Sequence, residues 1–432
     1  MRKLNTTLLS LLLGLGAALV GCSDYSFRIL PTSVDPPTIT RLAPPSGGGN
    51  GGTTGGRNTP SPWGNLSPAD LPEEYFALAW NDPRTGCHDC FTPVYVRPRY
   101  DIVDVQGRVV VSFDLPWSSY VDHLSMTAAG PARFLSVSGV WNAEGERPWK
   151  AWFGDGATGE VSVAMEWDWD GDVYLPQADR LIHLPEGLGD AHVMPDPANE
   201  DRIYVLPQNT TMYANPLLGT LYSIDLYDPE APVVTWSPED ILGEELIPEW
   251  GWAPWAPWHA EAYFDGQKPV IVLGLEVFDQ EGEYRRILKS FSPQLGPLGW
   301  EMDLTDVTNQ QNLSFQHSQD DQPATVLFHT GEPSWCHPAD FTRFNGTELT
   351  TVAGSPGMSC TQLGPVLDQE GRTFLYYGVQ LEAGIPRPLE QRLMISHDGV
   401  DVWQYSKFQE GLSSTPFVLH DLVRLEVPGE ES

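Results

Sequence analysis

The sequence predicts an all-β fold made of repeated units, and three observations support this prediction. Glycine and proline are frequent, at 41 and 39 residues among 432, and they separate short runs of β-branched and aromatic side chains. One hairpin pattern, a short strand followed by a polar turn and a second apolar strand, occurs five times. The copies are roughly 50–70 residues apart, which accommodates four strands and their loops, as in the blades of a β-propeller.

The clearest copy of the hairpin lies in the middle of the chain. It runs from Trp258 to Gly274 and turns at Asp265-Gly266, a dipeptide typical of tight hairpins. Further apolar and aromatic runs follow three of the five hairpins and predict a third and a fourth strand in those units; they are residues 219–226 and 233–236, 286–290 and 299–302, and 392–396 and 402–405. The other copies are at residues 122–137, 192–206, 316–328 and 364–377, and only the last lacks a histidine near its start.

The two ends of the globular part are incomplete units. Residues 75–80, 100–105 and 108–113 predict three strands, and residues 416–420 and 422–425 predict one or two more. Joining them into one blade would close the ring, remove its open edges and give six blades. Seven blades result if the C-terminal pair starts its own blade, and a double-layered β-sandwich is the alternative fold.

The N-terminus predicts export and lipidation. A basic start, Met1-Arg2-Lys3, precedes an apolar run that ends in Leu19-Val20-Gly21-Cys22. This pattern resembles the lipobox of bacterial lipoproteins, which implies cleavage before Cys22 and attachment of acyl chains such as palmitate to that residue. Ser23 follows the cysteine, and by resemblance to enterobacterial sorting this favours the outer membrane, with the domain on its periplasmic or surface face. An ordinary secretory signal peptide is the alternative.

Three segments follow from these patterns. Residues 1–21 form the signal peptide, and residues 22–70 form the lipidated cysteine and a flexible tether rich in proline, glycine and serine. Residues 71–432 form the propeller domain. Because no later apolar run reaches the length of a membrane-spanning helix, we expect the lipid alone to hold the protein to the membrane.

The charge of the chain limits its partners. There are 24 basic and 58 acidic residues, and the formal net charge is −34. Such a chain repels nucleic acid phosphates, so no nucleic acid partner is expected. Besides the membrane, the expected partner is a glycan, a small ligand or an envelope protein, although an acidic coat also serves solubility alone.

Four histidines are the first candidate site, because each lies near the start of the first strand of its unit. In a propeller this strand lines the central channel, so four imidazoles would point toward one axis. The arrangement resembles the way the carotenoid oxygenase family holds its iron and implies zinc or iron here, without any oxygenase activity. A polar channel rim is the alternative reading. The candidate metal ligands are His123, His192, His259 and His317.

An aromatic loop directly before His259 is the second candidate site. Tryptophan faces stack on sugar rings or hold apolar ligands, and loops at this place would lie at the channel mouth. Packing between blades is the alternative role of these rings. The candidate ligand-binding residues are Trp252, Trp255, Trp258 and Glu261, with Trp117 and Tyr120 before His123.

The third candidate is a calcium loop. Asp168, Asp170, Asp172 and Asp179 have the 1, 3, 5 and 12 spacing of calcium ligands, although the glycine is misplaced and no flanking helix is expected. A solvated turn is the alternative.

The remaining cysteines predict two disulfides in an exported protein. We expect one between Cys87 and Cys90 and another between Cys336 and Cys360. A zinc site that uses all four thiolates is the alternative.

One short motif concerns the fold rather than chemistry. Ser396, Asp398 and Trp403 match the Asp box of sialidase-like propellers, Ser-x-Asp-x-Gly-x-Thr-Trp, although the glycine falls one position early. The resemblance implies a structural turn between the two outer strands of a blade. The chain has no nucleophile elbow, phosphate loop or HExxH motif. We therefore expect a binding module first and a metal-dependent enzyme second.

Overall fold

The computed structural model divides the chain into two compact units, Met1–Asp35 and Pro36–Ser432, and everything described below belongs to the second. The described residues are 40–41, 74–81, 98–104, 109–114, 124–130, 132–139, 149–168, 170–184, 188, 190–208, 219–243, 259–278, 283–305, 313–316, 325–330, 340–354, 360–367, 372–381, 388–398, 400–407 and 419–425. Within them no helix is long and apolar enough to cross a membrane.

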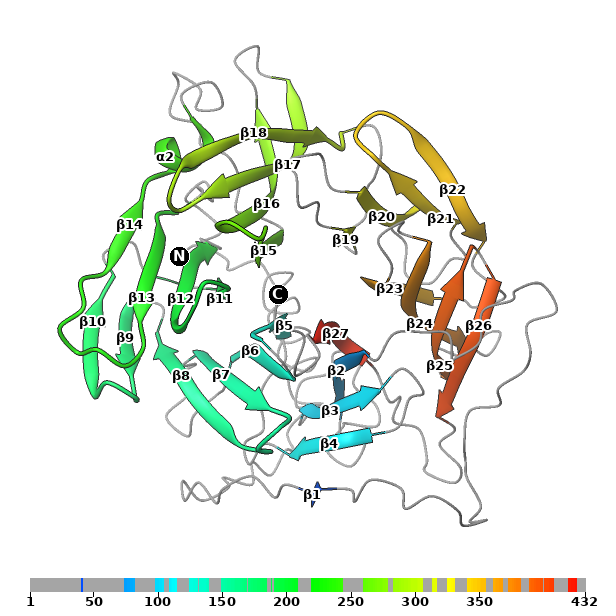
Figure 1. Ribbon diagram of the computed structural model, residues 1–432, viewed down its shortest axis with the longest axis horizontal. Helices are drawn as coiled ribbons and strands as arrows, with labels where there is room; N and C mark the ends of the chain where they lie inside the picture. The colour runs from blue at the N-terminus through cyan, green and yellow to red at the C-terminus, as the bar shows by residue number, and fades with distance from the viewer. Residues whose placement is uncertain are drawn as a thin grey trace, which may run out of the picture. The chain divides into compact units, whose positions relative to one another are not determined.

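These residues form six separate antiparallel sheets, which we number I to VI (Figure 1). Sheet I has the order β1 (Thr40–Arg41), β4 (Val109–Asp114), β3 (Pro98–Asp104), β2 (Tyr75–Asn81) and β27 (Leu419–Leu425). Sheet II has the order β10 (Arg180–His183), β9 (Asp172–Leu175), β8 (Val161–Trp167), β7 (Trp149–Asp155), β6 (Arg133–Gly139) and β5 (Leu124–Ala128).

The other four sheets each have four strands in chain order. Sheet III is β11 (Asp190–Asp196), β12 (Asn199–Gln208), β13 (Leu221–Asp225) and β14 (Val234–Trp236). Sheet IV is β15 (His259–Phe264), β16 (Pro269–Phe278), β17 (Tyr284–Ser292) and β18 (Gly296–Asp303). Sheet V is β19 (Leu313–Gln316), β20 (Thr325–Thr330), β21 (Asp340–Phe344) and β22 (Leu349–Gly354), and Sheet VI is β23 (Cys360–Val366), β24 (Thr373–Leu381), β25 (Pro388–His397) and β26 (Val400–Lys407).

The all-β prediction is confirmed, and the repeated four-stranded pattern appears in Sheets III to VI. The described strands form six sheets, not the two of a sandwich. Edge strands of neighbouring sheets contact one another: β5 contacts β11, β11 contacts β15, β19 contacts β23, and β23 contacts β27. Strand β27 also contacts β5. In Figure 1 these edge strands lie toward the middle of the drawing.

The predicted Asp-Gly turn joins β15 to β16, and Asp265 explains why it forms. Its Oδ1 accepts hydrogen bonds from the backbone N–H groups of Gln267 and Lys268, at 2.8 and 2.7 Å. Its Oδ2 accepts a 2.6 Å hydrogen bond from Nζ of Lys268, and both side chains are buried. Gly266 has a φ of 88°, a conformation that glycine adopts without strain.

The two ends of the domain meet in Sheet I. Strand β27 pairs with β2 in an antiparallel ladder from Tyr75 opposite Leu425 to Trp80 opposite Leu419. The predicted pairing between the first and last strands is therefore present, and β27 does not start a sheet of its own among the described residues.

Some elements lie outside the predicted pattern of four strands per unit. Strands β9 and β10 form a hairpin that extends Sheet II to six strands. The two-residue strand β1 lies in the stretch predicted as tether, and Thr40 pairs with Ser112 of β4. The short helix α2 (Pro238–Leu242) begins at Ser237, which forms a reciprocal capping box with Asp240.

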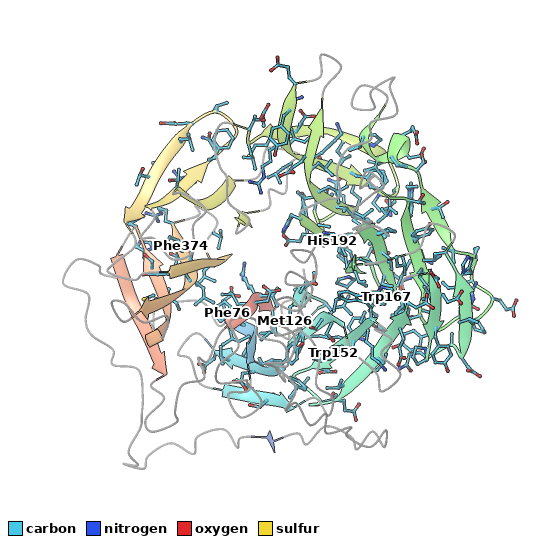
Figure 2. All side chains as sticks on the ribbon, turned by 180° about the vertical axis from the view of Figure 1, so that it is seen from behind. Phe76, Met126, Trp152, Trp167, His192 and Phe374 are labelled. Carbon is cyan, nitrogen blue, oxygen red and sulfur yellow. The ribbon has the colours of Figure 1, made fainter. Side chains whose placement is uncertain are left out.

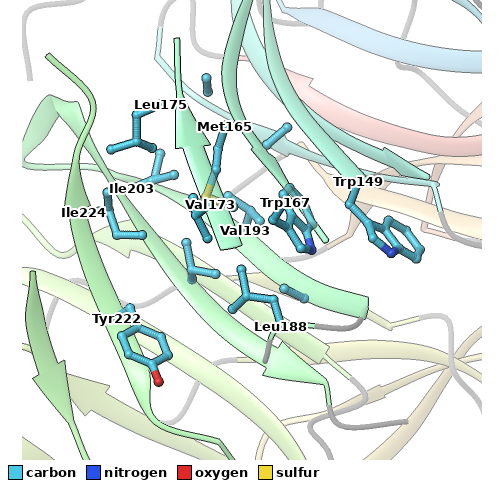
Figure 3. Packing of buried hydrophobic residues seen from close by; sticks show 14 of the residues in the cluster. Trp149, Met165, Trp167, Val173, Leu175, Leu188, Val193, Ile203, Tyr222 and Ile224 are labelled. Atoms are coloured by element: carbon cyan, nitrogen blue, oxygen red, sulfur yellow. The ribbon is translucent and has the colours of Figure 1, made fainter. Parts of the chain in front are cut away.

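Apolar clusters hold neighbouring sheets face to face. The cluster between Sheets II and III contains Trp149 and Trp167, whose rings stack with centroids 6.2 Å apart (Figure 3). A second cluster, between Sheets III and IV, contains Leu206 and Leu273. A third, between Sheets I and II, contains Trp152. Alternate residues of each strand supply the two faces, so a single sheet contributes to two clusters.

Candidate functional site

His259 and Glu261 lie on the edge strand β15 and face the same side of Sheet IV. In the ladder with β16, His259 is opposite Gly274 and Glu261 is opposite Val272. The Nε2 of His259 is 3.5 Å from Oε2 of Glu261, and their side chains are 25% and 34% exposed. The intervening Ala260 packs against the cluster between Sheets III and IV. The two polar side chains therefore lie on the opposite face of β15, which is turned away from Sheet III.

His192 has the corresponding position on β11, labelled in Figure 2. It is opposite Leu206, and its neighbours Ala191 and Val193 pack in the cluster between Sheets II and III. Like His259, His192 thus lies on the face turned away from the preceding sheet. His192 is the third residue of β11 and His259 is the first residue of β15, and their role as metal ligands stays a prediction.

The other two predicted metal ligands fall outside the described residues. In the sequence, His123 directly precedes β5 and His317 directly follows β19. Across the part of the chain that the structure describes, no three or more histidine, cysteine or acidic side chains form a group that could hold a metal ion. The four-histidine site therefore stays a prediction.

The four aspartates of the predicted calcium loop have separate local contacts around the β9–β10 hairpin. Oδ1 of Asp168 accepts a 3.0 Å hydrogen bond from the backbone N–H of Asp172, whose own Oδ1 is 2.8 Å from Nδ1 of His183. Asp179 accepts a 3.0 Å hydrogen bond from the hydroxyl of Tyr174. Asp170 is exposed in the turn before β9. The structure does not bring these four described carboxylates together as a metal group.

Several predicted residues lie outside the described part of the chain. Of the candidate ligand-binding residues, only Glu261 is described; Trp258 directly precedes β15 in the sequence. Cys360 begins β23, but its side chain is outside the description. The ligand-binding, lipidation and disulfide assignments therefore stay predictions. The remaining residues outside the described part of the chain are Trp117, Tyr120, Trp252, Trp255, Cys22, Cys87, Cys90 and Cys336.

The Asp-box-like segment forms the turn between β25 and β26, the third and fourth strands of Sheet VI, as expected for a structural turn. Asp398 has a φ of 47°, and its backbone N–H donates to the carbonyl of Arg372 at 3.1 Å. The corresponding turns in Sheets II, III and V start with Asp155, Asp225 and Asn345, whose side chains accept backbone hydrogen bonds. This turn chemistry is thus repeated in Sheets II, III and V, whereas the turn at Asp398 in Sheet VI forms a different backbone hydrogen bond.

Sequence reasoning missed Asp421 on β27. It is opposite Ala79, and its Oδ2 accepts a 2.7 Å hydrogen bond from the backbone N–H of Met126 in Sheet II. Burial raises the pKa of this carboxyl to about 7, and hydrogen bonds from the N–H groups of Met126 and Leu422 offset part of the effect. The sequence pattern could have indicated this position: Asp421, Val423 and Leu425 are every second residue of the strand, so they lie on the same face, and that face is apolar apart from the acid.

Comparison with known proteins gives weak structural similarity. No model of a known protein family matches the chain, and no curated protein matches it. The chain is similar to the SapL1 lectin, solved in complex with alpha methyl fucoside, at 11% identity and TM-score 0.37, over 80% of this chain and 100% of the lectin. It is similar to a hypothetical selenium-binding protein from Sulfolobus tokodaii at 12% identity and TM-score 0.35, over 84% and 77%. It is also similar to the β-propeller domain of the Trilobed protease from Pyrococcus furiosus at 10% identity and TM-score 0.29, over 76% and 84%.

Proposed function

We propose that this chain is a lipid-anchored envelope protein whose six sheets are the blades of a β-propeller and whose β15 region binds a glycan. The contacts between neighbouring edge strands and the ladder of β2 with β27 support the ring of blades. In this arrangement β27 supplies the innermost strand of the first blade, so the N- and C-terminal strands together complete it.

The observation that carries the binding function is the polar pair on β15. His259 and Glu261 are partly exposed on one face of the edge strand β15, whereas Ala260 and Ala262 on its other face pack against the cluster between Sheets III and IV. A carboxylate accepts hydrogen bonds from sugar hydroxyls, and an imidazole either donates or accepts them. The tryptophans that precede this strand in the sequence supply faces on which sugar rings stack. A glycan uses both kinds of contact.

Binding to purified envelope glycans tests this proposal. We expect immobilised peptidoglycan fragments or outer-membrane polysaccharide to retain the wild-type protein. Glu261→Gln and Trp255→Ala should each weaken binding about tenfold or more, because each removes a hydrogen bond or a stacking face. Glu239→Gln, on the exposed first turn of α2, is the matched control and should bind like the wild type. Equal binding by all four proteins, or no binding by the wild type, would contradict the glycan site.

A metal-dependent enzyme with the four-histidine site is the second candidate. The matching faces of His192 and His259 favour it, because equivalent positions in successive blades would direct their rings toward one channel. Metal analysis of protein purified without an affinity tag separates the candidates. One equivalent of zinc or iron that is lost in the His192→Ala, His259→Ala double variant supports the enzyme. A folded, metal-free protein that retains glycan supports the binding module.

A further inference from the structure

The turn between β21 and β22 of Sheet V contains an Asn-Gly sequence. Asn345 directly follows β21 and is exposed, and Gly346 has a φ of 92°. Oδ1 of Asn345 accepts hydrogen bonds from the backbone N–H groups of Thr347 and Glu348, at 3.1 and 2.8 Å. It also accepts a 3.1 Å hydrogen bond from the hydroxyl of Thr347. Two N–H groups and one hydroxyl therefore converge on a single amide oxygen.

The backbone nitrogen that follows this side chain differs from its counterparts in the similar turns of Sheets II and III. In Sheet II, the N–H of Gly156 donates a 2.8 Å hydrogen bond to the carbonyl of Ala132. In Sheet III, the N–H of Leu226 donates a 2.8 Å hydrogen bond to the carbonyl of Asp201. Within the described part of the chain, the N–H of Gly346 makes no hydrogen bond. In Sheet V this nitrogen is therefore available to react.

The turn restrains the side-chain amide beside this nitrogen. Cγ of Asn345 and the nitrogen of Gly346 are separated along the chain only by Cβ, Cα and the main-chain carbonyl carbon of Asn345, so a bond between them closes a small cyclic imide. The hydrogen bond from the N–H of Thr347 closes a ring that contains both atoms and thus restricts the distance between them. Because glycine has no Cβ, no side chain at position 346 obstructs the approach.

The same donors stabilise the charge that would develop during imide formation. When the nitrogen attacks Cγ, an electron pair of the amide carbonyl moves to Oδ1. The N–H and O–H groups of Thr347 and the N–H of Glu348 already donate to that oxygen, which is the arrangement of an oxyanion hole. Nδ2, the leaving group, makes no hydrogen bond within the described part of the chain, and Asn345 is exposed to the water that must supply a proton.

We propose that Asn345 is a site of spontaneous deamidation that its own turn promotes. The nitrogen of Gly346 gives its proton to water, and its electron pair forms the bond to Cγ. The bond from Cγ to Nδ2 then breaks, and Nδ2 takes a proton from water and leaves as ammonia. Water opens the imide: cleavage of the new bond to Cγ gives aspartate, and cleavage of the bond to the main-chain carbonyl carbon gives isoaspartate. The aspartate form preserves the turn, because Asp155 and Asp225 accept backbone hydrogen bonds at the same place in Sheets II and III.

Peptide mass spectrometry of the full chain, incubated at pH 6, 7 and 8, tests this site. It measures the replacement of –NH2 by –OH in the peptide that contains Asn345, and the reference is the same peptide cut from the chain before incubation. We expect the folded chain to deamidate at least as fast as the free peptide, and the rate to rise with pH because the attacking nitrogen must lose its proton. A folded chain that deamidates more slowly than the free peptide overturns the proposal, since the turn would then protect Asn345.

Thr347→Val separates the contribution of the turn from that of the Asn-Gly sequence. It removes the hydroxyl donor and keeps the backbone N–H, so deamidation of the folded chain should slow about two- to tenfold, the effect of one hydrogen bond. Thr350→Val, at an exposed position of β22, is the matched control and should deamidate like the wild type. A wild-type rate in Thr347→Val also overturns the proposal. If this variant does not fold, the comparison of the folded wild type with its free peptide still decides.

Discussion

Asp265 stabilises its turn through its negative charge as well as through its hydrogen bonds to the backbone. Burial opposes its ionisation, but hydrogen bonds from Lys268 and from the N–H groups of Gln267 and Lys268 outweigh this effect and lower the pKa of Asp265. A lowered pKa means that the ionised carboxylate stabilises the folded chain. This contribution is present above the unfolded pKa of about 3.9 and is lost as the pH falls through the folded pKa.

Asp265→Asn should therefore lower the free energy of unfolding by about 3 kcal/mol at pH 7, because it removes the carboxylate that pairs with the buried ammonium of Lys268. The difference from the wild type should shrink below about pH 4, where the wild-type carboxylate is protonated. Urea unfolding at pH 3 and 7 measures both values. Asp225→Asn in an exposed turn is the control, and its cost should stay below about 1 kcal/mol. A loss that is the same at both pH values would contradict this account of Asp265.

Gly154 illustrates a close approach of backbone to an aromatic ring. A Cβ atom at this position would lie 2.4 Å from Cζ of Phe134. The ring cannot move freely, because it packs against Tyr100, Phe113 and Trp152 at centroid distances of 5.6–5.7 Å. Gly154→Ala should destabilise the chain by about 1–3 kcal/mol. Thermal unfolding tests this value, and the added change Phe134→Leu should recover part of the loss specific to Gly154→Ala. Additive losses would show that the clash is not the cause.

At the scale of elements, the β9–β10 hairpin has one buried and one exposed face. Ile182 is 9% exposed and packs in the cluster between Sheets II and III, whereas Leu181 is 69% exposed. Arg180 links the hairpin to Sheet III through a 2.7 Å hydrogen bond to the carbonyl of Ala231. The hairpin therefore extends Sheet II and contacts the loop between β13 and β14 of Sheet III.

Ile182→Ala should lower the free energy of unfolding by about 2–4 kcal/mol, since it leaves a cavity in a shared core. Leu181→Ala removes the same type of side chain from the solvent-exposed face and should change it by less than about 0.5 kcal/mol. Denaturant unfolding of the two variants gives a matched comparison. Similar losses in both would mean that the hairpin is covered on both faces.

At the scale of the whole molecule, the net charge of −34 bears on how the protein would attach to a membrane through the predicted lipid anchor. The acidic chain has no electrostatic attraction to anionic lipids, so we predict that acyl chains at Cys22 are needed for attachment to a membrane. Cys22→Ser should move the protein from the detergent phase to the aqueous phase in a phase-separation assay and should abolish incorporation of labelled palmitate. Cys336→Ser is the control and should remain lipidated. A wild-type protein without label would contradict the anchor.

Much of the fold followed from local patterns. The predicted strands at 75–80, 100–105 and 108–113 match β2, β3 and β4, because alternation and turn residues are properties of neighbouring positions. The β9–β10 hairpin was not predicted from the sequence, because the spacing of its aspartates fits a calcium-binding loop as well as a turn. Of the candidate site, the location of His192 and His259 on the first strands of their units was predictable from the repeated hairpin, whereas the 3.5 Å approach of His259 to Glu261 was not.

The sequence by itself determined an all-β chain and the order of its repeated strands, since side-chain alternation and turn chemistry act over a few residues. The pairing of β27 with β2 was one of the alternatives that the sequence left open, and the tertiary structure decided it. Only the tertiary structure decided which faces meet: that Asp421 reaches Met126 of another sheet, and that His192 and His259 face away from the sheet before their own. These outcomes depend on how Sheets I to IV pack through shared clusters, and burial of this kind is a property of contacts between segments that are distant in the chain.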